Sequence, residues 1–251
     1  MSTELTTKNE DTAVAAAAPS AAFLAKRKAA QQSQGRSSIR IGVLHLHQGS
    51  GKEDMTYGPH PKGTFIDELS MSPVAVGTRL VPVHVEAYQA VWFAYESKKG
   101  DGRPLATFRD GEPRPKADES GTPIDYADQD VEIRDHLDLY VLLPGDSIPR
   151  LYRAKSTALR SVQSMNTMEV GRVNLGNVPG AYRLGTRQMS NDENQWHVPV
   201  FTADGDVTAD EMSMLEPAFD LVTSGKFEVV DAQAAPQPAD PMNPPADSIP
   251  I

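Results

Sequence analysis

Cysteine is absent from this chain of 251 residues, and no long apolar run occurs in it. Without thiols, the chain cannot form disulfides, a thiolate zinc site or a cysteine nucleophile. No stretch approaches the roughly 20 apolar residues that a helix needs to cross a bilayer. We therefore predict a protein of the reducing cytoplasm with no membrane segment.

The sequence also lacks the motifs that mark common catalytic and cofactor sites. It contains no nucleophile elbow, no paired-histidine zinc motif and no glycine-rich dinucleotide turn. Gly49, Ser50, Gly51 and Lys52 resemble the end of a phosphate-binding loop, but Glu53 follows where that loop needs serine or threonine. We predict a protein that is not an enzyme, with no catalytic residue, no metal site and no cofactor.

The net charge of −10 is distributed unevenly along the chain. Residues 1–40 carry a net charge of +3, residues 41–135 carry −6, residues 136–190 carry +4, and residues 191–251 carry −11. Much of the acidity therefore lies in the last quarter and in the run from Asp118 to Asp135. The basic stretch between them is suited to a polyanionic ligand.

Both ends of the chain have the composition of unfolded polypeptide. Residues 1–37 are rich in Ala, Ser, Gln and Thr, and residues 232–251 form a tract rich in Pro and Ala. Such segments bury too little apolar surface to offset the entropy of ordering them. We predict a disordered N-terminal segment (1–37), a folded body (38–231) and a flexible C-terminal tail (232–251).

The body shows mainly strand patterns. Strands are predicted near residues 39–47, 76–95, 137–143, 150–153, 180–187 and 195–201, where β-branched and aromatic residues are frequent or apolar positions alternate. Helices are predicted over 156–170, with Gly171 as the stop, and over 208–224, where Thr208 and Glu211 form a capping box. The fold class is therefore mainly β with added helices, and an OB-like small barrel is the predicted architecture.

Aromatic and basic residues recur together in the body. Proteins that bind single strands without sequence preference combine aromatic faces, on which bases stack, with cations that follow the phosphates. Tyr88 and Trp92 are spaced to share one face of a strand, as are Arg153 and Lys155. The predicted DNA-binding residues are Tyr88, Trp92, Lys98, Lys99, Arg103, Phe108, Arg109, Arg150, Tyr152, Arg153, Lys155 and Arg183.

The last residues of the chain form a compact recognition motif. Asp247 is followed by Ser248, Ile249, Pro250 and Ile251, which places a carboxylate beside an apolar plug. This tip resembles that of bacterial single-stranded DNA-binding proteins, which ends in acids followed by Ile, Pro and Phe. The resemblance implies that Asp247, Ile249, Pro250 and Ile251 bind partner proteins.

The layout as a whole resembles that of a phage-type single-stranded DNA-binding protein used in DNA replication or recombination. The resemblance implies an OB-fold that coats single strands in the host cytoplasm without catalysis and recruits replication or recombination proteins through its tail. The sequence leaves the oligomeric state open, with a homo-oligomer among the alternatives. Two other classes remain open from the residues. One is a structural or assembly protein of a virion, and the other is an acidic inhibitor of a host DNA-processing enzyme.

Overall fold

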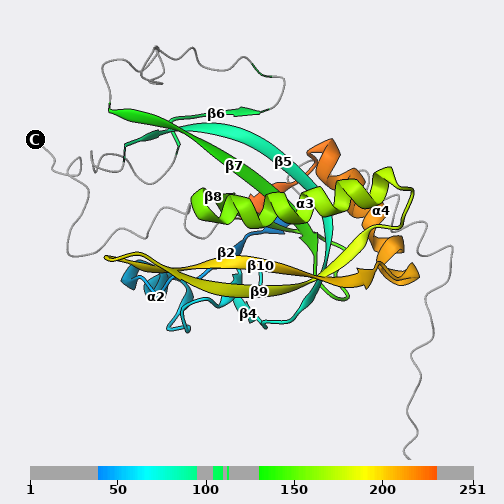
Figure 1. Ribbon diagram of the computed structural model, residues 1–251, viewed down its shortest axis with the longest axis horizontal. Coiled ribbons are helices and arrows are strands. Elements are labelled where there is room, and N and C mark those ends of the chain that lie inside the picture. Colours follow the sequence, from blue (N-terminus) through cyan, green and yellow to red (C-terminus); the bar gives the residue numbers. More distant parts are fainter. Residues whose placement is uncertain (1–38, 95–103, 110–111, 113–129, 231–251) are drawn as a thin grey trace, which may run out of the picture. The chain divides into compact units, whose positions relative to one another are not determined.

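The computed structural model describes residues 39–94, 104–109, 112 and 130–230. The predicted N-terminal segment (1–37) and C-terminal tail (232–251) therefore lie outside the described residues. Figure 1 shows strands as the main elements, with α3 and α4 packed against them. The prediction of a mainly β fold with added helices is confirmed.

The described part of the chain contains three sheets. The largest has the order β10-β9-β5-β7-β8, with β6 paired to the outer part of β5. Its strands are β5 (Arg79–Phe93), β6 (Ala106–Arg109), β7 (Val131–Leu142), β8 (Arg150–Lys155), β9 (Gly180–Ser190) and β10 (Gln195–Asp206). A small antiparallel sheet contains β2 (Leu44–Leu46), β3 (Phe65–Asp67) and β4 (Ser72–Val74), and β1 (Arg40–Gly42) pairs in parallel with β11 (Glu228–Val230).

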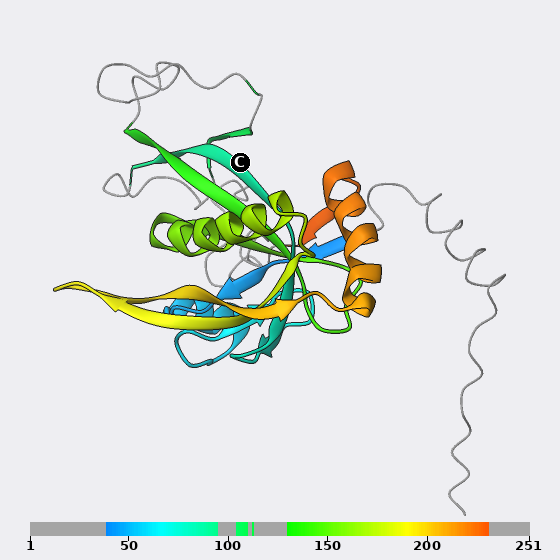
Figure 2. The same ribbon diagram turned by 45° about the vertical axis from the view of Figure 1, so that its right-hand side comes forward.

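The large sheet stays open, which corrects the prediction of an OB-like barrel. Its outermost strands, β8 and β10, do not pair with each other among the described residues. Strand β5 pairs with β9 only at Arg79 and Leu80 and then diverges from it. Figures 1 and 2 show α3 lying between the two diverging arms, so a helix rather than barrel closure covers this sheet.

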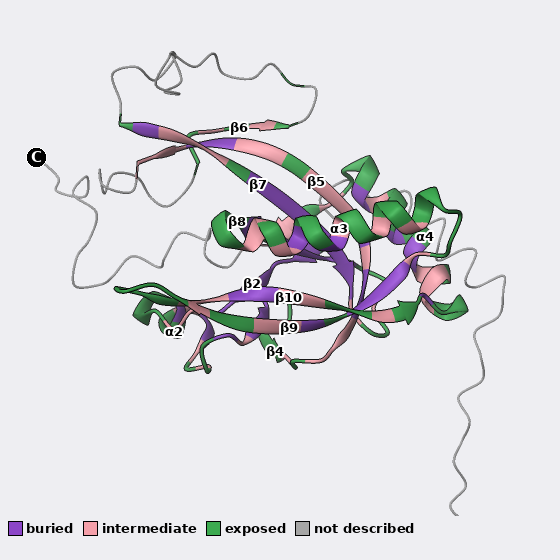
Figure 3. Cartoon of the chain, in the orientation of Figure 1, coloured by how far each residue is buried: buried purple, intermediate pink, exposed green. Residues whose placement is uncertain are grey.

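Helices cover the two faces of the sheet and create a core on each. On one face, α3 (Leu159–Asn174) contributes Val162 and Met165 to a cluster with Leu137, Leu139 and Val141 of β7. On the other face, α4 (Ala209–Ser224) contributes its buried residues to a cluster with Tyr140 and Leu142. Figure 3 shows the buried colour running along β7 between these layers.

The predicted helices form, with one difference in length. The capping box of α4 is present, because the Thr208 hydroxyl accepts a hydrogen bond from the Glu211 N–H and the Glu211 carboxylate accepts one from the Thr208 N–H. The helix ends at Gly225, which adopts the left-handed conformation that glycine favours. The first predicted helix begins as the short 3₁₀ helix η4 (Ser156–Ala158), and α3 continues through Gly171 to Asn174. The prediction that the helix ends at Gly171 is therefore wrong.

The short helix α2 (Gly51–Tyr57) was not among the predicted elements. It begins with a second capping box, formed by Ser50 and Glu53, in the segment that resembles a phosphate-binding loop. The carboxylate of Glu53 also accepts a hydrogen bond from His45 of β2. Burial opposes ionisation of Glu53, but the bonds from His45, Ser50 and Gln48 outweigh it and lower its pKa to about 2. This cluster fastens α2 to β2.

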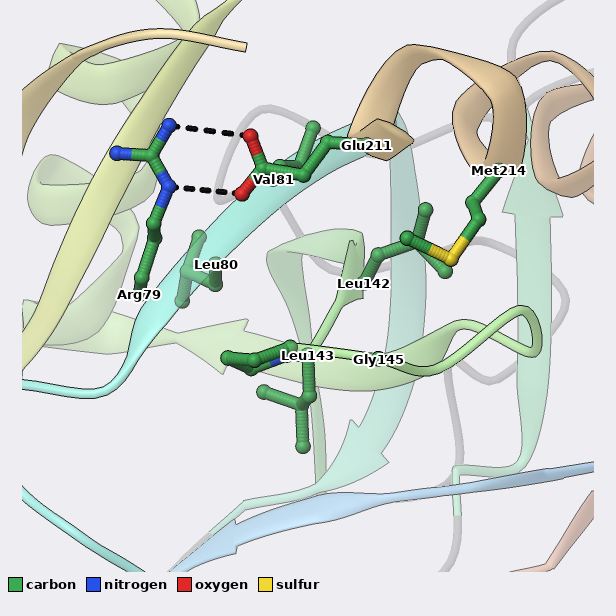
Figure 4. Close-up of a pocket in the computed structure, with 9 residues that line it drawn as sticks. Arg79, Leu80, Val81, Leu142, Leu143, Gly145, Glu211 and Met214 are labelled. Carbon is green, nitrogen blue, oxygen red and sulfur yellow. Dashed lines mark hydrogen bonds and ion pairs between the residues drawn. The ribbon is translucent and has the colours of Figure 1, made fainter. Parts of the chain in front are cut away.

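An ion-paired arginine joins β5, β10 and the start of α4. Arg79 donates to Glu211 at 2.7 Å through Nε and to the Asp204 carboxylate at 2.9 Å through Nη1. Figure 4 shows its bidentate contact with the Glu211 carboxylate beside a small cavity. That cavity has a volume of about 10 Å³, so it holds at most one water molecule and is not a ligand site.

Candidate nucleic-acid interface

Four strands place aromatic and basic side chains on one surface. The antiparallel register sets Tyr88 of β5 opposite His136 of β7 and opposite Arg109 of β6. The same register sets Lys155 of β8 opposite His136, and Arg153 opposite Asp138. Since directly paired residues project to the same face, these side chains share one surface. We call this surface the β5–β7 face, defined by Tyr88, Trp92, Arg109, Arg134, His136, Asp138, Arg153 and Lys155.

Three rings on the β5–β7 face form a continuous stack. The His136 ring lies 5.0 Å from that of Tyr88 and 5.7 Å from that of Trp92, measured between centroids, with small interplanar angles of 13° and 26°. The Trp92 indole N–H also donates to His136 Nε2 at 3.0 Å. Because Trp92 holds this nitrogen as an acceptor, the hydrogen bond requires the neutral imidazole.

A guanidinium group lies over each of the two outer rings, those of Tyr88 and Trp92. Arg109 Cζ lies 5.9 Å from the centre of the Tyr88 ring, and Arg134 Cζ lies 5.8 Å from that of Trp92. Arg109 forms an ion pair with Glu86, and Arg134 forms one with Glu132. Tyr88 and Trp92 are therefore each covered in part by a side chain that is long enough to move aside.

The central ring of the stack is buried and has cations near it. Burial lowers the pKa of His136 to about 4, and the charges of Lys155, Arg134 and Arg153 act in the same direction. The imidazole is thus neutral at physiological pH, which agrees with its role as acceptor of the Trp92 hydrogen bond.

Asp138 is the buried acid of this face. Its residue is 3% exposed, and Arg153 Nε lies 3.9 Å from its Oδ1 atom. Burial raises its pKa from 3.8 to about 6, and the nearby Glu86 adds to this effect, while Arg153 and Arg109 oppose it. The folded state therefore binds this proton more tightly than the unfolded chain. The resulting cost of ionisation is absent below pH 4 and complete above pH 6.

Asp138→Asn should therefore stabilise the protein at alkaline pH. The expected gain is about 1–3 kcal/mol at pH 8, shrinking toward zero near pH 4, because the amide keeps the shape of the side chain and removes the buried charge. Urea unfolding of both proteins across this pH range measures the difference. A loss of stability at pH 8 would instead show that attraction to Arg153 and Arg109 outweighs burial.

The structure brings together part of the predicted DNA-binding set. Tyr88, Trp92, Arg109, Arg153 and Lys155 share the β5–β7 face. Phe108 pairs with Gln89 and lies on the opposite face of the sheet from Arg109. Lys98, Lys99 and Arg103 lie outside the described residues, as do Asp247, Ile249, Pro250 and Ile251 of the tip.

The remaining predicted residues take other positions. Tyr152 is 7% exposed and packs edge-on against Phe65 in the core under α3. Arg150 is buried and bonded to Asp67, and Arg183 is bonded to Asp204 at the β9–β10 end of the sheet. None of the three lies on the β5–β7 face, so we leave them out of the candidate site.

Arg134 and His136 were not among the predicted DNA-binding residues. Arg134 lies in the segment that was interpreted as an acidic run and His136 directly follows it, although both alternate with Ile133, Asp135 and Leu137 as strand residues do. Extending the strand pattern of residues 137–143 backward by this alternation would have found them.

Residues 60–228 match the family model described as Pam3 phage gp34-like protein. The chain belongs to the Pam3 phage gp34-like family. The match spans most of the described structure, including every residue of the β5–β7 face. It supports the predicted phage origin. No curated protein and no solved structure matches the chain.

The described residues offer few features for other kinds of site. Among them, no group of three or more histidine or acidic side chains is placed to hold a metal ion. His45 and His47 instead pair separately with Glu53 and Asp54, at 2.8 and 3.2 Å. No helix within the described ranges is long and apolar enough to cross a membrane.

Proposed function

We propose that this phage protein binds single-stranded DNA on the β5–β7 face, without catalysis, during replication or recombination of phage DNA. The observation that carries the proposal is the stack of Tyr88, His136 and Trp92, which four cations surround. Bases stack on aromatic faces at about 1–3 kcal/mol each, whatever their sequence. Arg109, Arg134, Arg153 and Lys155 provide the partners for phosphates on the same surface.

Binding requires the two capping arginines to move. In the free protein the guanidinium groups of Arg109 and Arg134 lie over the rings of Tyr88 and Trp92. We propose that each guanidinium swings onto a backbone phosphate and that a base takes its place on the ring. At each position the exchange breaks one cation–π contact and one ion pair, with Glu86 or Glu132, and forms a stacked base and a charge-assisted hydrogen bond to the phosphate.

The carboxylates of the face limit its affinity. Glu86, Glu132 and Asp138 lie beside the cations and offset most of their charge. A surface with little net charge binds DNA weakly enough to release it again, and salt weakens the phosphate contacts further. These properties suit a protein that coats DNA reversibly. The tip residues Asp247, Ile249, Pro250 and Ile251 remain the proposed contact for replication or recombination proteins.

Tryptophan fluorescence tests the proposal directly. The chain has two tryptophans, Trp92 on the β5–β7 face and Trp196 on β10, where its indole N–H donates to Thr157 at 3.1 Å. In the Trp196→Phe protein, an oligo(dT) strand should quench the remaining Trp92, because a stacked base quenches indole emission. In the Trp92→Phe protein the remaining Trp196 should keep its intensity.

Salt separates this proposal from the structural alternative. The measured affinity should fall steeply between low and moderate salt, because phosphate binding releases counterions. If the Trp196→Phe protein shows no quenching with oligo(dT) at low salt, the proposal is wrong. Self-assembly without nucleic acid would then favour a virion component.

A further inference from the structure

A large groove separates α3 from α4. Its volume is about 810 Å³, within the range of sites that bind ligands and peptides. Its floor includes Val83 and Val85 of β5, Met165 of α3 and Leu215 of α4. Figures 1 and 2 both show the C-terminal half of α3 close to α4. We call this site the α3–α4 groove.

The rim of the groove exposes apolar side chains. Val170 is 51% exposed, Val173 is 60% exposed, and Phe219 of α4 is 45% exposed. Single exposed apolar residues are common, but three around one hollow form a patch of the kind that marks an interaction site. Burying them against a partner would remove unfavourable hydration.

A free edge of β5 runs along the bottom of the groove. Residues 82–85 line it consecutively. Val83 belongs to the core cluster under α4, His84 packs edge-on against Phe219 of α4, and Val85 packs against the cluster under α3, so the strand passes between the two helices at the bottom of the groove. Among the described strands, β5 pairs with β9 at Arg79 and Leu80 and with β6 from Tyr88 to Val91. Between these two pairings the edge carries no described strand, so its backbone groups are open to an added strand.

The charges of the groove are negative. Glu216 and Asp220 lie one turn apart on α4, both are exposed, and neither forms an ion pair within the described part of the chain. Like charges at this spacing destabilise a helix. Glu169, the third acid, is already engaged, since it accepts hydrogen bonds from the Gly180 N–H and the Tyr182 hydroxyl. A cation placed between Glu216 and Asp220 would relieve their repulsion.

We propose that the α3–α4 groove binds an extended peptide segment of a partner protein that alternates apolar and basic side chains. The apolar side chains contact Val170, Val173 and Phe219, the basic ones pair with Glu216 and Asp220, and the peptide backbone pairs with the edge of β5. The site is separate from the β5–β7 face, and its acidity disfavours DNA. The proposal therefore stands independently of the function proposed above.

Fluorescence anisotropy with two labelled peptides tests this proposal on the full chain. One is a short peptide of alternating leucine and lysine, and the other has glutamate in place of lysine. The wild-type protein should bind the lysine peptide at least about tenfold more tightly than the glutamate peptide. Glu216→Lys/Asp220→Lys should reverse this preference. Val173→Ser/Phe219→Ser should abolish binding of both peptides while leaving the melting temperature close to wild type, because both residues are exposed.

The matched control is Asp192→Lys/Glu193→Lys, which makes the same charge change in the exposed turn between β9 and β10. It should keep the wild-type preference, as should Arg153→Ala/Lys155→Ala. The proposal fails if the control variant loses affinity for the lysine peptide as the groove variant does. It also fails if the wild-type protein binds both peptides with equal affinity, or binds neither peptide. It also fails if sedimentation shows a dimer that Val173→Ser/Phe219→Ser dissociates, because a second copy would then fill the groove.

Discussion

Arg153→Ala/Lys155→Ala is expected to weaken binding of single-stranded DNA by about 10- to 100-fold at low salt. Both side chains project from β8 onto the β5–β7 face, opposite Asp138 and His136, and both are exposed. An exposed contact between a cation and a phosphate should contribute about 0.7–1.4 kcal/mol, between the values for an exposed ion pair and for a charge-assisted hydrogen bond, so the loss of two such contacts corresponds to this range.

The salt dependence provides a second measure of the same variant. Each cation that contacts a phosphate of a single strand adds about 0.7 to the slope of log affinity against log salt. The double variant should therefore lose about 1.4 from this slope, and its affinity should approach that of wild type as salt rises. An unchanged slope with reduced affinity would mean that the two residues act without touching phosphates.

The matched control removes one lysine and one arginine elsewhere. Lys52 lies on α2 and Arg160 on α3, which packs on the opposite face of the sheet, and both are exposed. Lys52→Ala/Arg160→Ala should bind DNA within about twofold of wild type, because only the net charge changes. If this control weakens binding as much as the β8 variant, the β5–β7 face is not the site. Arg153→Lys/Lys155→Arg should restore most of the affinity, since both positive charges remain.

The sequence was sufficient to predict features that depend on neighbours along the chain. The capping box of Thr208 and Glu211 defined where α4 begins, and the alternation along β8 placed Arg153 and Lys155 together on one face. The irregular pairing near Pro82 also fits its sequence, because the register of β5 shifts between Pro82 and His84, where proline cannot donate to the ladder. These features are local, so periodicity and capping chemistry reveal them.

The features that the sequence did not predict depend on partners far along the chain. Whether a sheet closes is decided by which strands meet at its edges, and here α3 occupies the space between the diverging strands. Tyr152 and Trp92 have similar chemistry, yet one packs against Phe65 in the core and the other lies on the β5–β7 face. No pattern around either residue distinguishes these outcomes, because the packing partner comes from another strand.

Arg150 is the clearest case of this kind, and its replacement by alanine is expected to destabilise the protein by about 3–5 kcal/mol. Its Nε donates to Asp67 Oδ1 at 2.9 Å and its Nη1 donates to the Ile148 carbonyl at 2.8 Å. The Asp67 side chain is only 7% exposed. The variant therefore leaves a buried carboxylate without its cation, which is the costly way to break a buried ion pair.

Urea unfolding of Arg150→Ala, compared with Arg153→Ala from the same strand, measures this effect. Arg153 is 40% exposed and its Nε lies 3.9 Å from the Asp138 carboxylate, so its loss should lower the free energy of unfolding by less than the loss of Arg150 does. Asp67→Asn in the Arg150→Ala background should recover part of the stability, because the amide removes the uncompensated charge. Under conditions where Arg150→Ala remains folded, its affinity for oligo(dT) should equal that of wild type. Normal stability with weakened DNA binding would instead place Arg150 in the binding surface, as its sequence neighbours first indicated.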